Sequence, residues 1–235
     1  MNSTKKKARL AGALYVLVLI TGIFGLIYVP GKLFVAGDAA ATIGNILLHE
    51  SLFRLYIANG IVSTVIFMFV ALALYDLFKD VNRNQATVMV ILVVIQVPMA
   101  LVGTLNQVAV LELVRGVDYL SFLSRAQLDG LAMFCLHLDD QLTLAYELFW
   151  GLWLFPLGWL VIKSRSMPRF IGIWLLINGA AYVITFLVGF LLPEYLDKTN
   201  MIMFPLLMGE VVFMFWLLIM GMKPVTKTEP VPSSA

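Results

Sequence analysis

The run LAGALYVLVLITGIFGLIYV, residues 10–29, decides the fold class, because it carries no charged residue over its whole length. About 20 residues of this kind span the hydrocarbon core of a bilayer as a helix. The basic stretch Lys5-Lys6-Lys7-Ala8-Arg9 comes directly before it, as in a secretory signal peptide. The apolar region of a signal peptide is shorter, however, at about 7–15 residues. The run therefore predicts an uncleaved first transmembrane helix.

The same apolar character recurs along the chain. Of the 235 residues, 61% are hydrophobic and only 13% are charged, and the mean hydropathy is +0.95. A soluble domain carries about 25% charged residues, so the solvent of this chain must be lipid. Windows of about 19 residues predict six membrane-spanning helices. They lie at about residues 9–29, 52–78, 87–111, 140–162, 169–191 and 202–222. We expect a single all-α integral-membrane domain over residues 1–222, built as a six-helix bundle, and a disordered tail over residues 223–235.

The basic residues predict how the bundle is oriented. The loops on one side and the two ends of the chain carry eleven of the sixteen Lys and Arg, and the opposite side carries five. Cytoplasmic loops carry the excess of Lys and Arg. The pattern therefore predicts that both termini lie in the cytoplasm.

Two longer connections are expected on the outside, over residues 30–51 and 112–139. The second alternates apolar residues such as Leu120, Phe134 and Leu138 with polar ones. This amphipathic pattern predicts a helix that lies in the outer membrane interface or caps the bundle.

Several classes of function find no support in the sequence. The net charge of +2 and the lack of a basic stripe argue against nucleic-acid binding. No GxSxG, Walker or GxGxxG motif occurs, and no HxxxH or HExxH spacing predicts a metal site. We therefore predict no cofactor and no metal. The outer loops hold nine acidic residues, which favours cationic ligands. The expected partners are membrane lipids and a small cationic or polar ligand.

Polar residues inside the spans are the candidates for a site, because ionisable groups at membrane depth are costly. Glu147 and Glu210 lie in the fourth and sixth predicted spans, Asn59 in the second, Gln107 in the third and Thr185 in the fifth. At a rise of 1.5 Å per residue, they lie about 6 to 12 Å from the outer end of their helices. These residues form one layer in the outer half.

Helical phase predicts that this layer faces into the bundle. Glu147 shares a helix face with Gly151 and Gly158, and Gln107 shares one with Gly103. Small residues mark the faces where membrane helices pack closely. The polar groups therefore either line a pocket open to the outside or form hydrogen-bonded clamps between helices.

Three functions fit this pattern. The first is a binding or transport protein that uses the polar layer together with Arg54, which we expect to pair with an acid or a lipid phosphate. The second is a membrane-embedded enzyme acting on a lipid or isoprenoid substrate, with His137, Asp139, Asp140 and Arg54 as acid, base and phosphate holder. The third is a structural or regulatory membrane partner. The sequence favours the first, and a non-enzymatic role over catalysis.

Two stretches resemble a bacterial integral-membrane family. One contains Phe53-Arg54-Leu55 and continues through LALYDLFK at residues 72–79 to Val81-Asn82-Arg83. The other contains FWGLWLFPLG at residues 149–158 and then Lys163-Ser164-Arg165, MPRFIG at residues 167–172, Asn178-Gly179 and Tyr182. The family is the domain of unknown function 4386. The resemblance implies a multi-pass protein of the bacterial inner (cytoplasmic) membrane and assigns no catalytic residues.

Overall fold

The computed structural model describes residues 3–223, and these residues form helices and turns without a strand. Six segments are long and apolar enough to cross a membrane, which confirms the predicted six-helix membrane bundle. We call them spans one to six: Ser3–Leu33, Glu50–Phe78, Arg83–Arg115, Arg125–Ser164, Arg169–Leu191 and Pro193–Ile219. The tail predicted for residues 223–235 lies outside the described residues apart from Lys223.

Several spans are built from more than one helix. Span one holds α1 (Ser3–Ile23), the π-helical η1 (Phe24–Tyr28) and α2 (Val29–Leu33). Span two is α4 (Glu50–Phe78), and span five is α9 (Arg169–Leu191). Span three holds α5 (Arg83–Val94) and α6 (Gln96–Arg115), and span four holds α7 (Arg125–Leu152) and α8 (Leu154–Ser164). Span six holds η3 (Pro193–Tyr195), α10 (Leu196–Met203) and α11 (Met208–Ile219). Outside the spans lie α3 (Ala39–Leu48) and η2 (Asp118–Leu120).

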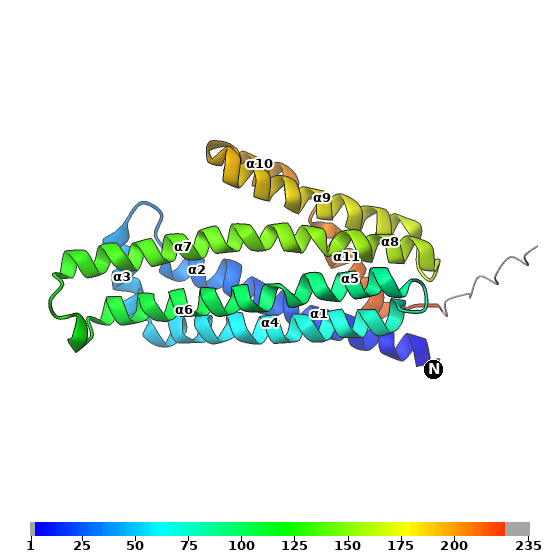
Figure 1. Ribbon diagram of the computed structural model, residues 1–235, viewed down its shortest axis with the longest axis horizontal. Coiled ribbons are helices and arrows are strands. Elements are labelled where there is room, and N and C mark those ends of the chain that lie inside the picture. The colour runs from blue at the N-terminus through cyan, green and yellow to red at the C-terminus, as the bar shows by residue number, and fades with distance from the viewer. Residues whose placement is uncertain (1–2, 224–235) are drawn as a thin grey trace, which may run out of the picture.

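The spans are arranged as a ring in the order of the sequence. Each span packs against the next one along the chain, from α1 on α4 to α9 on α11. The ring closes where α11 of span six packs against α1 of span one. The chain enters and leaves at the same end of the bundle, where the α4–α5 and α8–α9 turns also lie, while the α6–α7 turn is at the opposite end (Figure 1). The cytoplasmic placement of the termini stays a prediction.

The amphipathic stretch expected to lie in the membrane interface is part of a span instead. Residues 125–139 form the first half of α7, which continues without a break to Leu152. A capping box of Ser124 and Gln127 starts the helix. Its apolar residues Leu128 and Leu136 are buried, with Leu136 packed among residues of α6 and α3. Phe134 and Leu138 of the same stretch are exposed, so its apolar residues are only partly covered by protein. The helix that holds the fourth span begins at Arg125, fifteen residues before the predicted position 140.

Apolar side chains fill both ends of the ring and leave its middle open. We call the cluster at the end of the termini the first core; it includes Ala8, Leu74, Met89, Leu157 and Leu217. The second core, at the other end, includes Val29, Ile46, Phe53, Val110 and Leu136. Because α3 and α2 contribute to the second core, the connection predicted as a loop over residues 30–51 helps to close that end of the ring.

Four spans are interrupted between the two cores. The interruptions are η1 in span one, Ile95 in span three, Trp153 in span four and residues 204–207 in span six. A proline lies in or within three residues of each: Pro30, Pro98, Pro156 and Pro205. Proline lacks the backbone N–H and clashes with the carbonyl of the preceding turn, so it bends or breaks a helix. Irregular backbone at membrane depth is tolerated where it is buried in protein or lines a cavity.

Candidate functional site

A cavity of about 470 Å³ lies inside the ring, between the two cores. Tyr15, Val93 and Trp153 of the first core form one end of it. Tyr56, which packs against the second core, contributes to the other end. Every interrupted span supplies lining residues at its interruption: Gly25 and Leu26, Gln96, Trp153, and Phe204 with Leu207. The broken helices thus surround the cavity.

The first polar group of the cavity is centred on Glu210, in the first turn of α11. The hydroxyl of Tyr15, on α1, donates a hydrogen bond to the Glu210 carboxylate. Tyr182 and Asn178 of α9 lie beside the same carboxylate. Asn178 also donates to the carbonyl of Leu207 over 3.2 Å, at the break that precedes α11. Spans one, five and six thus meet at a single acid.

The second polar group is centred on Asp139, in the middle of α7. The side-chain amide of Gln107 donates to Asp139 Oδ2 over 2.9 Å, and the Tyr56 hydroxyl donates to the same oxygen over 3.3 Å. These donors come from α6 and α4. Asp139 therefore joins spans two, three and four, as Glu210 joins spans one, five and six.

Neutral polar groups line the wall formed by spans one and two. Thr21 Oγ1 donates to Ser63 Oγ over 3.0 Å, and Asn59 donates to the backbone carbonyl of Thr21 over 3.0 Å. A Cβ atom on Gly25 would lie 2.8 Å from the Asn59 amide nitrogen. Glycine at position 25 therefore lets the π-helical segment approach α4 this closely.

Aromatic rings make up much of the remaining lining. Trp153 is fully buried and meets Phe67 with a centroid distance of 4.9 Å and Tyr15 with one of 6.0 Å, both edge to face. Trp150 stacks on Tyr146 at 5.9 Å. Tyr182 and Phe204 complete the aromatic lining, together with Tyr56.

Both carboxylates lack a basic partner in the cavity. The described residues that line it include no lysine, arginine or histidine. Their contacts are hydroxyl and amide donors, which do not neutralise a negative charge. The cavity is therefore acidic as well as aromatic.

Three of the six predicted site residues line this cavity: Asn59, Gln107 and Glu210. Glu147, Thr185 and Arg54 are not part of the lining. Glu147 lies on the face of α7 that packs on α9, since a Cβ on Gly151 of that face would lie 2.6 Å from the Gly179 carbonyl. Its Oε2 atom is buried without a hydrogen-bond partner among the described residues. Thr185 is buried on α9.

Arg54 lies at the molecular surface, where its Nε donates to Glu50 over 2.8 Å. This confirms the expected pairing with an acid. Arg115 approaches the other oxygen of Glu50 at 3.7 Å. Arg54 is therefore held in an exposed ion-pair group outside the cavity.

The four residues considered for an enzymatic function do not share one site. Asp139 faces the cavity, whereas His137, Asp140 and Arg54 are exposed. Over residues 3–223, no group of three or more His, Cys, Asp or Glu side chains could hold a metal ion.

Most of the lining comes from residues that the sequence did not predict to form a pocket. On α7 the cavity face carries Asp139, Leu142, Thr143, Tyr146 and Trp150. The spacing of three, four and seven from Asp139 is that of a single helix face. Recognising the Ser124–Gln127 capping box would have placed Asp139 inside the helix and predicted this face.

Comparisons with known proteins identify the family of this chain. The family described as domain of unknown function DUF4386 matches residues 10–221, which is nearly the whole chain. The chain belongs to the DUF4386 family. An uncharacterized protein of Archaeoglobus fulgidus is 42% identical to it over 82 residues, which are 35% of this chain and 47% of the relative. The match thus spans about half the length of that relative. No solved structure matches the chain.

Membership of DUF4386 confirms the family resemblance noted in the sequence, and the six spans agree with a multi-pass membrane protein. The family description names no activity. Any function of this DUF4386 member therefore has to be argued from its cavity.

Proposed function

We propose that this DUF4386 protein binds a small organic cation in the cavity between its two cores. The observation that carries the proposal is the pair of carboxylates, Asp139 and Glu210, in a cavity whose described lining has no basic residue. An unpaired negative charge at membrane depth is costly, and a bound cation offsets that cost.

The aromatic lining supports an organic cation over a metal ion. Tyrosine and tryptophan rings attract ammonium groups through their negative faces, and the attraction is larger where water is excluded. The cavity presents rings of Tyr15, Tyr146, Trp150, Trp153 and Tyr182. A bare metal ion prefers several oxygen, nitrogen or sulfur ligands at short distances, and the described residues gather no such set.

The size of the cavity supports a small molecule. Its volume of about 470 Å³ lies within the 300–1,000 Å³ range usual for small-molecule sites. Such sites are mostly apolar with a few placed polar groups, as this lining is.

Binding of tetraethylammonium to the purified full-length protein, measured by equilibrium dialysis, tests the proposal. We expect saturable binding that weakens about tenfold or more in Glu210→Gln and in Asp139→Asn, because each change removes a buried charge facing the cation. Glu147→Gln is the matched control, since Glu147 lies in the same span as Asp139 but outside the lining. Its affinity should stay within about twofold of the wild type.

If tetraethylammonium does not bind, or if binding survives in the double variant of Glu210 and Asp139, the proposal fails. The two acids are then clamps between helices. Uptake of the same probe into proteoliposomes measures whether the bound cation also crosses the membrane.

A further inference from the structure

Both ends of the ring are closed by apolar packing. The second core seals the end formed by α2, α3 and the beginning of α4, with Val29, Ile46 and Phe53 fully buried. The first core seals the end near the termini, where Leu74, Leu157 and Leu217 are fully buried. A ligand can therefore reach the cavity most directly through the side of the ring.

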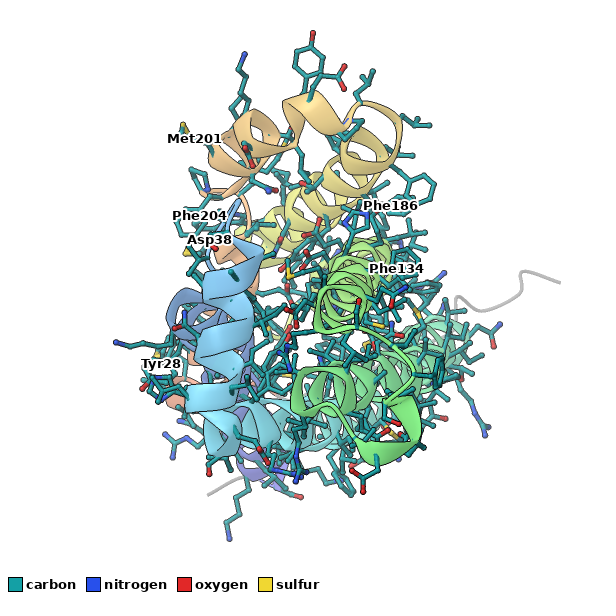
Figure 2. All side chains as sticks on the ribbon, turned by 90° about the vertical axis from the view of Figure 1, so that its left-hand side faces the viewer. Tyr28, Asp38, Phe134, Phe186, Met201 and Phe204 are labelled. Carbon is teal, nitrogen blue, oxygen red and sulfur yellow. The ribbon has the colours of Figure 1, made fainter. Side chains whose placement is uncertain are left out.

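Three exposed residues of the cavity lining show where the cavity reaches the side of the ring. Leu26 and Ile27 of η1 are 54% and 66% exposed, and Phe204 of span six is 63% exposed, although all three line the cavity. Tyr28, at the end of η1, and Phe204 lie on one flank of the molecule, with Phe134 of α7 and Phe186 of α9 on the other (Figure 2). The cavity thus reaches the surface between η1 and the break that precedes α11.

The border of this opening is apolar. The residues that border it are Ile23, Leu26 and Ile27 on one side and Phe204, Leu207 and Met208 on the other. None of these side chains carries a hydrogen-bonding group, and all six lie within segments apolar enough to cross a membrane. A hydrated ion would lose its water here without compensation, whereas an alkyl chain would gain apolar contact.

The irregular backbone on both sides is consistent with an opening that is built into the fold. On one side η1 is π-helical, a form that recurs at functional positions in helices. On the other side the break in span six is fixed from α9, where Trp174 Nε1 donates to the Leu206 carbonyl over 3.1 Å. The edge of the opening is therefore held in place by hydrogen bonds.

From this arrangement we infer that the ligand is an amphiphilic amine that enters from the bilayer, with its ammonium head between Glu210 and Asp139 and its alkyl chain in the opening between η1 and span six. The inference rests on the proposed function, and it adds a chain to the ligand and a lipid-side route to the cavity. The ammonium head is assigned to the two carboxylates because their charges are opposite. The alkyl chain is assigned to the opening because the border of the opening is apolar.

Chain length provides the test. Tetramethylammonium, hexyltrimethylammonium and octyltrimethylammonium are dialysed against the full-length protein in lipid nanodiscs, and affinity is referred to the free aqueous concentration. We expect the affinity to rise from tetramethylammonium to hexyltrimethylammonium and again to octyltrimethylammonium. Every two added methylene groups should raise it by about threefold or more, because each methylene that leaves water for the apolar opening makes the binding free energy more favourable.

Gly22→Leu then tests the position of the chain. Gly22 lines the cavity next to Ile23, and a Cβ built on it meets no atom within 4 Å, so the position has room to begin a larger side chain beside the opening. We expect this variant to bind octyltrimethylammonium at least tenfold more weakly than the wild type, and to lose less affinity for tetramethylammonium, which has no chain to place in the opening. Gly44→Leu on α3 also enters open space, but Gly44 does not line the cavity, so it should leave both affinities unchanged.

Each outcome separates the two proposals. If no quaternary ammonium binds, the proposed function itself fails. If all three probes bind with equal affinity through Glu210 and Asp139, the cation site stands and the amphiphilic ligand is overturned. If affinity rises with chain length but Gly22→Leu does not reduce it, the opening between η1 and span six is overturned as the place of the chain.

Discussion

The hydrogen bond from Tyr15 to Glu210 joins two residues that are 195 positions apart in the chain. Tyr15 is 6% exposed, and its ring packs edge to face on Trp153 and Phe213. A carboxylate packed among aromatic rings depends strongly on its hydrogen-bond donors, because these rings offer no other donor to replace them. The Tyr15 hydroxyl therefore stabilises the Glu210 carboxylate and also forms part of the cavity wall.

Tyr15→Phe tests this dependence. The change removes one hydroxyl, keeps the ring, and leaves a buried carboxylate with one donor fewer, which costs about 1–3 kcal/mol. We expect the free energy of unfolding of the purified protein, measured by denaturant titration in detergent, to fall by that amount.

Tyr119→Phe is the matched control. The Tyr119 hydroxyl also donates to a glutamate, Glu112, and this hydrogen bond raises the pKa of Tyr119, but the pair is exposed. Water replaces the lost hydroxyl there, so stability should change by less than about 0.5 kcal/mol. Equal losses in the two variants would contradict a special role for Tyr15.

The residues of the cavity differ in how well the sequence predicts them. Glu210 stands out because it is an ionisable residue in an apolar span, and Asn59 and Gln107 stand out because they are polar residues in such spans. Tyr15 and Trp153 do not, because aromatic residues are ordinary members of such spans. The sequence predicts Asp139 in the outer connection over residues 112–139, whereas the structure places it in the middle of α7, facing the cavity.

At the scale of elements, the ring closes where α1 meets α11. A Cβ atom on Gly12 would lie 2.5 Å from the backbone nitrogen of Leu218 and 2.8 Å from its Cα. These are backbone atoms, which cannot turn aside as a side chain can. Glycine at position 12 therefore sets how closely span six approaches span one.

Gly12→Ala should destabilise the protein by about 1–3 kcal/mol, the cost of overpacking a tight contact. Gly22→Ala, ten residues further along the same helix, places its methyl group in open space. It should leave stability unchanged or raise it by up to about 1 kcal/mol, because alanine favours the helix over glycine. Thermal unfolding of both variants under the same conditions measures the difference, and a stable Gly12→Ala variant would contradict the close contact of α1 and α11.

The ends of a helix can be predicted from the sequence where prolines mark them. Span five was predicted at residues 169–191 and is observed at Arg169–Leu191, because Pro168 precedes it and Pro193 follows soon after. The sequence analysis does not predict the breaks inside four other spans, although a proline lies in or near each of them. Hydropathy averages over about 19 residues and does not register a single disrupted turn.

At the scale of the whole molecule, the number of spans followed from hydropathy, whereas their circular order did not. Hydropathy measures transfer into lipid, and lipid is as apolar as a neighbouring helix. The arrangement depends on close contacts such as Gly151 with Gly179 and Gly158 with Gly172, which become visible only when two helices are placed together.

The orientation of the ring in the membrane is a prediction with a direct test. In a Cys135→Ser background, which removes the single native cysteine, a cysteine is introduced at Ser121 in the α6–α7 turn or at Asp80 in the α4–α5 turn. Both positions are exposed, and the two turns lie at opposite ends of the bundle. We expect a membrane-impermeant maleimide to label position 121 in intact cells and position 80 only after permeabilisation. The reverse pattern would place the termini outside.

The closure of the ring by its last span also sets a time order for assembly. Spans are made in sequence, so Tyr15 is synthesised 195 residues before Glu210. At about 5–20 residues per second, ribosomes need about 10–40 s to cover that distance. Until span six is inserted, the ring lacks the span that closes it, and Tyr15 lacks the carboxylate to which its hydroxyl donates. The cavity is thus completed only when span six is inserted, so the insertion of this span is the last step in its assembly.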